Sequence, residues 1–217
     1  MIFRTLAERM KVFCDAADLY PVISSEFCAG RDPLAVLRAV GAGGAKLFQL
    51  REKHRSDREL YDLARAAREI ADEYGMLFIL DDRADIALAA GADGVHLGQD
   101  DLPVAAAKQL APELIVGSST HNLEEALAAE QSGADYLNIG PIYPTRTKSV
   151  ACGALGVAAI GRIAPQLHIP FTVMGGIKMR HIAELRAAGA RRIAMVTEIT
   201  QAPDVTAAVR RLRELFR

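Results

Sequence analysis

Short apolar runs and longer, alanine-rich helical patterns alternate eight times along this chain of 217 residues. Strands separated by helical crossovers pair in parallel, and eight such units close most naturally into a (β/α)8 barrel. An open doubly wound sheet is the alternative, but the stretch SSEFCAGRD after the first strand lacks the expected glycine-rich turn. We expect strands at 21–24, 46–50, 77–80, 93–97, 114–118, 136–140, 171–175 and 192–196.

Helix signals support the same division of the chain. A Ser-x-x-Glu capping box at Ser56–Glu59 starts the clearest helix, over 56–75, which closes on a glycine. An extra helix is expected at about 3–17, before the first strand. Because no linker or low-complexity tract interrupts the alternation, we predict an α/β chain, 1–217, forming a single (β/α)8 TIM barrel domain at about 20–215 with an extra N-terminal helix.

Net charge, the length of apolar runs and the cysteine count limit the kinds of molecule that this protein is expected to bind. A formal net charge of −1 gives no global field for nucleic acid or an anionic membrane, so any anion site must be local. No apolar run is long enough to span a membrane, and the N-terminal segment lacks the uninterrupted core of a signal peptide. Three cysteines without metal-ligand spacing are typical of reduced thiols. We expect a cytoplasmic protein that binds small molecules, with homo-oligomerisation left open.

Polar residues gather where the predicted strands end, which is where a barrel builds its active site. Cations cluster after the second and sixth strands, and carboxylates cluster after the third and fourth. In QLREK, alternation places every second side chain on one side of an extended segment. The residues concerned are Gln49, Arg51 and Lys53, then Asp81, Asp82 and Arg83, then His96, Gln99, Asp100 and Asp101, then Ser118, Ser119 and His121, then the PTRTK of 144–148, then Gly175 and Gly176, and finally Thr197.

These residue types suit phosphate and a divalent cation. Arginine and lysine supply positive charge for phosphate oxygens, hydroxyl groups donate hydrogen bonds, and a glycine pair lets the backbone approach a phosphate. Asp82 and Asp101 offer hard oxygen ligands, and Mg2+ is commonly held by one or two carboxylates plus substrate phosphates. A structural salt bridge to Arg83 or Arg51 is the alternative for this pair. The pattern alone predicts a metal-assisted barrel enzyme acting on phosphorylated small molecules.

Several segments, in this order and spacing, resemble the thiamine-phosphate synthase family, also called thiamine-phosphate pyrophosphorylase. They are QLREK, DDRADIALAAGADGVHLGQDDL, GSSTH, GADYLNIGPIYPTRTK and MGGI, and the resemblance covers about 20–200. It implies a Mg2+-dependent transferase that joins 4-amino-5-hydroxymethyl-2-methylpyrimidine diphosphate to 4-methyl-5-(2-phosphoethyl)thiazole. The products would be thiamine phosphate and pyrophosphate, formed through a dissociative reaction with a pyrimidine cation. A thiazole tautomerase of the TenI group and a non-catalytic thiazole-phosphate-binding barrel are the alternatives.

The resemblance also implies roles for individual residues. It assigns catalysis to Arg51, Lys53 and Lys148, and metal binding to Asp82 and Asp101. The set for the pyrimidine diphosphate is Gln49, Arg51, Lys53, Asp81, His96, Ser119 and Lys148. The set for the thiazole phosphate is Thr145, Arg146, Thr147, Gly176, Val196 and Thr197.

The chain departs from the family pattern at three positions. Asp81 stands where the family usually has asparagine, and its charge should repel a diphosphate unless a metal or Arg83 neutralises it. Glu198 brings an anion near the expected monophosphate site, where Lys178 could help to bind phosphate in place of a missing asparagine.

His121 is expected to have a structural or orienting role, because the implied reaction needs no general base.

Overall fold

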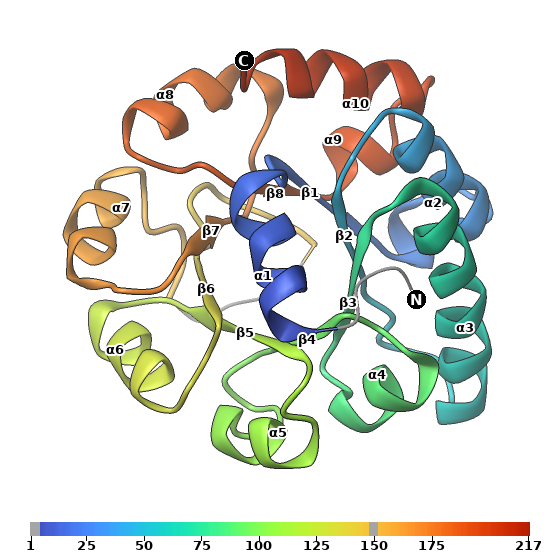
Figure 1. Cartoon of the computed structure of the whole chain (residues 1–217). Coiled ribbons are helices and arrows are strands. Elements are labelled where there is room, and N and C mark those ends of the chain that lie inside the picture. Colours follow the sequence, from blue (N-terminus) through green and yellow to red (C-terminus); the bar gives the residue numbers. More distant parts are fainter. Residues whose placement is uncertain (1–4, 148–151) are drawn as a thin grey trace.

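Eight parallel strands close into a barrel in the computed structural model, which describes residues 5–147 and 152–217. Each strand pairs with its neighbours in chain order, and the first also pairs with the last (Figure 1). The prediction of a (β/α)8 barrel is confirmed. The strands are β1 (Leu19–Ile23), β2 (Leu47–Leu50), β3 (Leu77–Asp81), β4 (Gly94–Leu97), β5 (Ile115–Thr120), β6 (Tyr136–Ile139), β7 (Phe171–Val173) and β8 (Ile193–Met195).

Helices surround the strands, and α1 (Leu6–Asp15) lies across the end of the barrel (Figure 1). Within the described ranges, none of the helices combines the length and apolar character that crossing a membrane requires. The others are α2 (Pro33–Ala42), α3 (Asp57–Tyr74), α4 (Ala84–Ala90), α5 (Val104–Leu110), α6 (Leu123–Gln131), α7 (Ala158–Ile163), α8 (Ile182–Ala187), α9 (Thr197–Thr200) and α10 (Val205–Glu214), with 3-10 turns η1 (Ser25–Phe27), η2 (Ala164–Gln166) and η3 (Met179–His181).

The expected helix caps are present, whereas one strand begins earlier than predicted. The Ser56 hydroxyl accepts a hydrogen bond from the Glu59 backbone and the Glu59 carboxylate accepts one from the Ser56 backbone, which completes the capping box of α3. Strand β1 starts at Leu19, two residues before the expected start at Pro21. Proline ordinarily argues against a strand interior because it has no N–H to donate. Here Pro21 lies opposite Met195 of β8, and the strand continues beyond it.

The apolar residues form two layers. One lies between the strands and the surrounding helices, and the other fills the inside of the barrel. Phe13 of α1 belongs to the inner layer, where its ring packs on Tyr136 with centroids 4.6 Å apart. The end covered by α1 is therefore filled with side chains, as expected for a barrel of this size.

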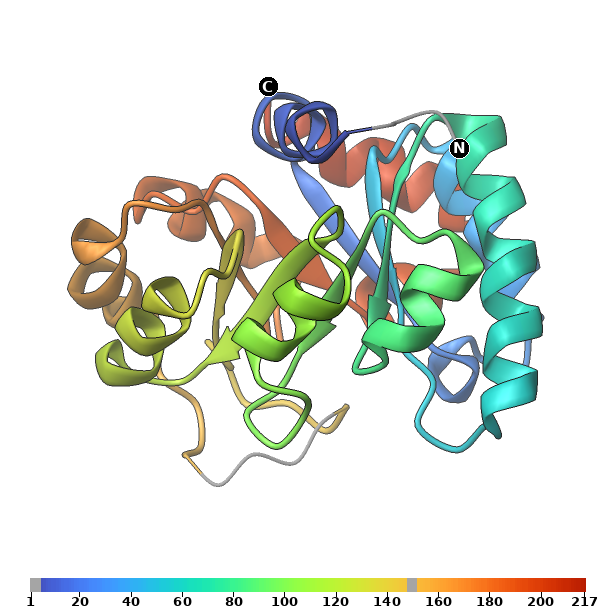
Figure 2. The ribbon, with the colours of Figure 1, turned by 60° about the horizontal axis from the view of Figure 1, so that its bottom comes forward.

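Buried arginines fix α1 to the barrel. Arg192 donates hydrogen bonds to the backbone carbonyls of Phe13 and Cys14, at 2.6 and 2.7 Å. Arg9 donates to the carbonyl of Glu113 at 2.6 Å and forms an ion pair with Asp93 at 3.3 Å. Figure 2 shows α1 at one end of the barrel and the segment after β6 at the other, so the polar strand ends face away from this helix.

Candidate active site

A pocket lies at the carboxyl ends of the strands, and side chains from around the barrel line it. Counting the space open at its mouth, it measures about 1020 Å³. Most of the residues predicted for the site share this lining. They are Gln49, Arg51, Asp81, Asp82, His96, Ser119, Thr145, Thr147, Gly176, Val196 and Thr197.

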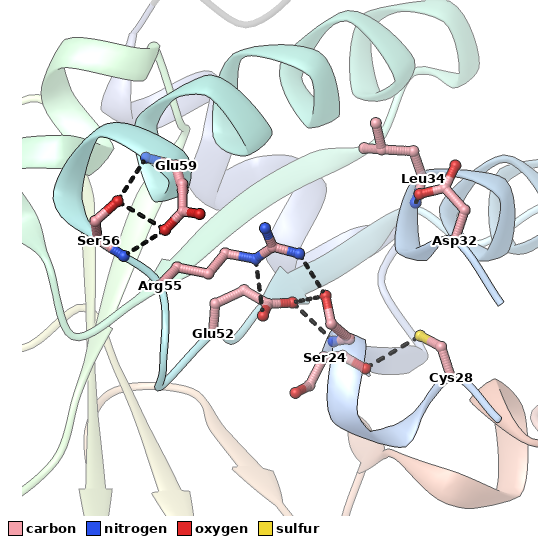
Figure 3. Close-up of polar contacts among 9 residues, drawn as sticks. Ser24, Cys28, Asp32, Leu34, Glu52, Arg55, Ser56 and Glu59 are labelled. Carbon is pink, nitrogen blue, oxygen red and sulfur yellow. Dashed lines mark hydrogen bonds and ion pairs between the residues drawn. The ribbon is translucent and has the colours of Figure 1, made fainter. Parts of the chain in front are cut away.

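The segment after β2 presents its side chains to two sides in alternation. Gln49 and Arg51 face the pocket, whereas Glu52 turns toward η1 after β1. There the Glu52 carboxylate accepts hydrogen bonds from the backbone N–H and the hydroxyl of Ser25, at 2.7 and 2.8 Å. Arg55 joins this network by bonding both partners, and Figure 3 shows it beside the capping box of α3. The alternation predicted from QLREK thus places Glu52 where it connects the loops after β1 and β2, and it places Arg51 in the pocket.

Asp81, at the end of β3, lies among the residues of the β2 segment. Its carboxylate accepts a hydrogen bond from Gln49 at 3.1 Å. It also forms ion pairs with Arg51 at 3.3 Å and Lys53 at 3.4 Å. The Arg83 guanidinium, which the sequence offered as its neutralising partner, is instead bound to Asp57 and Asp85. Arg51 and Lys53 therefore balance the Asp81 charge, because their cations lie within contact distance of it.

Asp82 and Asp101 form a pair of contacting carboxyl groups beside Lys53. Burial works to raise the pKa of Asp82, but the hydrogen bond and the charge of Lys53, together with hydrogen bonding to Asp101 and Asp81, lower that pKa below its usual value. Burial raises the pKa of Asp101, and contact with Asp82 raises it further against the hydrogen bond from the Gly98 backbone. Asp82 also holds a left-handed backbone with φ of 64°, which non-glycine residues rarely adopt. Such strain is often found at functional sites.

The pair suits a divalent cation. The two carboxyl groups are in contact, and their pKa values shift in opposite directions. Lys53 supplies positive charge next to them by pairing with Asp82 and Asp81. Within residues 5–147 and 152–217, no group of three or more His, Cys, Asp or Glu side chains has a metal-binding arrangement. A hard cation such as Mg2+ would therefore take its remaining ligands from substrate phosphate and water.

The loop after β6 is held against the glycine pair after β7. Ile142 and Tyr143 donate backbone hydrogen bonds to the carbonyls of Met174 and Gly175, at 2.8 and 3.0 Å. Gly176 has a φ of 62°, and a Cβ there would lie 2.3 Å from the Pro144 carbonyl oxygen. The glycine pair thus makes room for the loop after β6.

The same loop presents two hydroxyl groups to the pocket. The hydroxyl oxygens of Thr145 and Thr147 lie 3.0 Å apart, and both residues line the pocket. Arg146, between them, is exposed and lies outside the lining. Lys148 lies outside the described residues.

Lys178 and Glu198 form an ion pair at 3.1 Å on the β7–β8 side of the pocket. Lys178 also donates a hydrogen bond to the Thr197 hydroxyl at 3.4 Å, and Glu198 accepts one from the Met179 backbone at 3.0 Å. Lys178 therefore balances the negative charge of Glu198. The Glu198 carboxylate also caps the first residue of η3.

One further lining residue was expected to have a structural role, and three others were not predicted to lie at the site. His121 bonds the Glu125 carboxylate at 2.8 Å, in keeping with the expected structural role. Sequence reasoning missed Ser24, Phe27 and Asn138, which all line the pocket. Asn138 carried the clearest signal, because it is a polar residue within an apolar strand, and Thr172 donates a hydrogen bond to its side chain at 2.9 Å.

The fold and the site together define a (β/α)8-barrel enzyme whose pocket is lined by cationic groups, hydroxyl groups and Asp82, with Lys53 and Asp101 in contact with Asp82. The family model described as thiamine monophosphate synthase matches residues 19–199, and the chain belongs to this family. It is 44% identical to the thiamine-phosphate synthase of Shouchella clausii over 88% of this chain and 91% of that one. Identity to the thiamine-phosphate synthase of Chloroflexus aurantiacus is also 44%, over 91% of each chain.

A solved structure agrees with these relatives. The thiamine phosphate pyrophosphorylase from Pyrococcus furiosus superposes with a TM-score of 0.85 and 36% sequence identity. The match covers 92% of this chain and 95% of that one. The resemblance stated from the sequence is thereby confirmed at the level of the family and the fold.

Proposed function

We propose that this protein joins 4-amino-5-hydroxymethyl-2-methylpyrimidine diphosphate to 4-methyl-5-(2-phosphoethyl)thiazole, giving thiamine phosphate and pyrophosphate. One observation carries the proposal. The pocket has one side lined by Arg51, Asp81 and Asp82, with Lys53 and Asp101 in contact with Asp82, and a separate side with hydroxyl groups, glycines and a lysine after β6 to β8. Two such sides suit two phosphorylated substrates held against each other.

The cationic side is proposed to bind the diphosphate. Arg51 offers a forked guanidinium and Lys53 a compact ammonium, and both lie next to the carboxyl pair. Burial works to lower the pKa of Lys53, but the charges of Asp81 and Asp82 raise it, so the ammonium keeps its proton. Ser119 and Lys148 are proposed to complete this side, while Gln49 and His96 border the pyrimidine ring.

Asp82 and Asp101 are proposed to hold Mg2+, which when bound would supply positive charge for the diphosphate and for the leaving group. The fit rests on the two contacting carboxyl groups, which offer hard oxygen ligands beside Lys53. Asp81 lies against the same cations and would share in the charge balance of the bound state.

The other side is proposed to bind the thiazole phosphate. The hydroxyl groups of Thr145 and Thr147 would face the thiazole, and the backbone at Gly176, Val196 and Thr197 would approach its phosphate. Lys178 lines the same side, where it donates a hydrogen bond to the Thr197 hydroxyl and pairs with Glu198. Arg146 is proposed to bind this phosphate as well, which requires its exposed side chain to turn toward the pocket.

The proposed reaction needs no covalent intermediate and no general base. The bond between the pyrimidine methylene carbon and the diphosphate oxygen breaks, and its electron pair leaves with pyrophosphate. Arg51, Lys53 and Lys148 stabilise the developing charge on that leaving group. The thiazole nitrogen then donates its lone pair to the pyrimidine cation, and the phosphate anchor keeps it close enough to react before water does.

Incubation of the purified protein with both substrates and Mg2+ tests the proposal, with formation of thiamine phosphate as the readout. We expect Lys148→Ala to lower turnover by about 100-fold or more, because a cation proposed to stabilise the leaving group is lost. The circular dichroism of this variant should match that of the original protein. Absence of product at every Mg2+ concentration would overturn the proposal, and binding of the thiazole phosphate without product would favour a non-catalytic barrel.

A further inference from the structure

A line of hydrogen-bonding groups runs from the inside of the barrel to the pocket. The Tyr20 and Tyr136 hydroxyls lie 2.9 Å apart, and the Tyr136 hydroxyl lies 2.9 Å from Nδ1 of His96. On the other side of the ring, Nε2 of His96 lies 2.9 Å from Oγ of Ser119. All four residues are buried, and both His96 and Ser119 line the pocket. The reaction proposed above gives no part to either tyrosine.

The surrounding residues leave a built space for the Tyr136 ring. A Cβ on Gly117 would lie 2.1 Å from Cζ of Tyr136, so only glycine at this position admits the phenol. Phe13 of α1 covers the ring from the other side, with centroids 4.6 Å apart. The phenol is therefore fixed by packing, and its hydroxyl is held next to His96.

The end of the line decides the direction of every hydrogen bond in it. In the described part of the chain, Tyr136 is the one hydrogen-bond partner of the buried Tyr20 hydroxyl, so Tyr20 must donate its proton there. A buried hydroxyl that only accepted would leave its own proton without an acceptor, which is costly. Tyr136 then accepts from Tyr20 and has a single proton of its own to donate to Nδ1 of His96.

The direction continues through the imidazole ring. A neutral histidine that accepts at Nδ1 carries its proton on Nε2, and this N–H donates to Oγ of Ser119. The Ser119 hydroxyl proton is then free to point into the pocket. The opposite tautomer would draw that proton back to His96 and turn a serine lone pair toward the pocket, which an anion would avoid.

We propose that Tyr20 and Tyr136 are positioning residues that hold His96 as its Nε2–H tautomer, so that Ser119 donates its hydroxyl proton into the pocket. The direction of the hydrogen bonds rests on the geometry alone. That the proton meets a diphosphate rests on the function proposed above. Burial raises the pKa of both phenols, which keeps both as donors over the working range of pH.

Nitrogen NMR of protein with 15N-labelled histidine tests the tautomer without any substrate. The His96→Gln variant identifies the His96 signals by their disappearance. We expect an unprotonated Nδ1 and a protonated Nε2 in the original protein, and a mixture of tautomers in Tyr136→Phe. A protonated Nδ1 in the original protein, or an unchanged spectrum in Tyr136→Phe, would overturn the proposal. If Tyr136→Phe does not fold, Tyr20→Phe gives the same test through a smaller shift toward the mixture.

Calorimetric titration with inorganic pyrophosphate and Mg2+ tests the use of this proton. We expect Ser119→Ala to weaken binding about 10- to 100-fold, as for loss of a hydrogen bond to a charged group. Tyr136→Phe should weaken it about three- to tenfold, and Tyr20→Phe less, because Tyr136 can still donate to His96. Tyr74→Phe, which removes a hydroxyl at the end of α3, is the matched control and should change nothing.

The double variant Ser119→Ala with Tyr136→Phe separates a positioning role from a general loss of structure. If the tyrosine acts through the serine, the double variant binds pyrophosphate as weakly as Ser119→Ala alone. Losses that simply add would overturn the positioning role. If the original protein shows the expected tautomer but does not bind pyrophosphate, the proposed function fails while the direction of the hydrogen bonds stands.

Discussion

The two ends of the barrel use the same kinds of residue for opposite purposes. At the end covered by α1, Arg68 bonds Asp93 at 2.6 Å, and their side chains are 5% and 0% exposed. At the pocket end, Lys53 bonds Asp82 while 34% of the lysine side chain is exposed. The first end is closed to solvent, and the second is open to a ligand.

This difference in burial decides what each ion pair can do. Burying a charge is costly, and the cost is offset only when hydrogen bonds and an opposite charge surround it, as they do for Asp93. An exposed cation remains solvated and can exchange one anion for another with little penalty. We therefore expect substitutions at the α1 end to change stability, and substitutions at the pocket end to change catalysis and binding.

The largest expected effect is at the α1 end. Asp93→Ala leaves Arg9 and Arg68 buried without their shared carboxylate, and should lower the free energy of unfolding by about 3–5 kcal/mol. Urea denaturation measures this loss, while turnover per folded molecule should stay near normal. Asp62→Ala breaks an exposed pair with Arg58 on α3 and serves as the control with no measurable change. An equally small loss for Asp93→Ala would break the comparison.

Asp82→Ala is the matching substitution at the pocket end. It should lower turnover by about 100-fold or more, because one side of the proposed cation position is lost. The urea midpoint should hardly move, since Lys53 can return to solvent. Asp100→Ala, which removes an exposed carboxylate next to Asp101, is the control and should keep full turnover. Normal turnover in Asp82→Ala would show that the carboxyl pair is structural.

Gly176→Ala is expected to affect both stability and ligand binding. The new methyl group would press on the carbonyls of Pro144 and Tyr143 and would hold a left-handed backbone, a strain of about 1–3 kcal/mol. Thiazole phosphate should bind about tenfold more weakly, since the loop after β6 must shift. Gly75→Ala shares the left-handed φ of 63° but meets no neighbour within 4 Å. Its thiazole phosphate affinity should be normal, and an equal loss in both variants would point to backbone strain alone.

The smallest expected effect is that of Asp81→Asn. The amide removes a negative charge that now holds Arg51 and Lys53, so pyrophosphate with Mg2+ should bind equally well or up to about tenfold more tightly. Calorimetry measures the affinity, and turnover should be kept or raised. A large loss of turnover would instead make Asp81 a functional metal ligand.

The pocket end was far more predictable from the sequence than the α1 end. Polar residues at strand ends stand out against apolar runs, so Arg51 and Asp82 could be placed by their position in the barrel alone. Arg68 follows Leu60 and Ala64 at helical spacing on the buried face of α3, but the pattern does not identify Asp93 as its partner, because only tertiary contacts bring the two together. Asp57 was missed as a partner of Arg83 for the same reason, because this contact depends on the approach of the start of α3 to the end of β3.

The opposite directions of Arg51 and Glu52 limit how the chain can change in length. Replacing one side chain in QLREK affects one contact, but inserting one residue before Arg51 would reverse the phase of the whole segment. The glutamate would then enter the pocket, and the arginine would face the serine of η1 that Glu52 now binds. Two loops would lose their connection at the same moment as the pocket lost a cation. Surface loops usually tolerate such insertions, whereas here the number of residues matters as much as their identity.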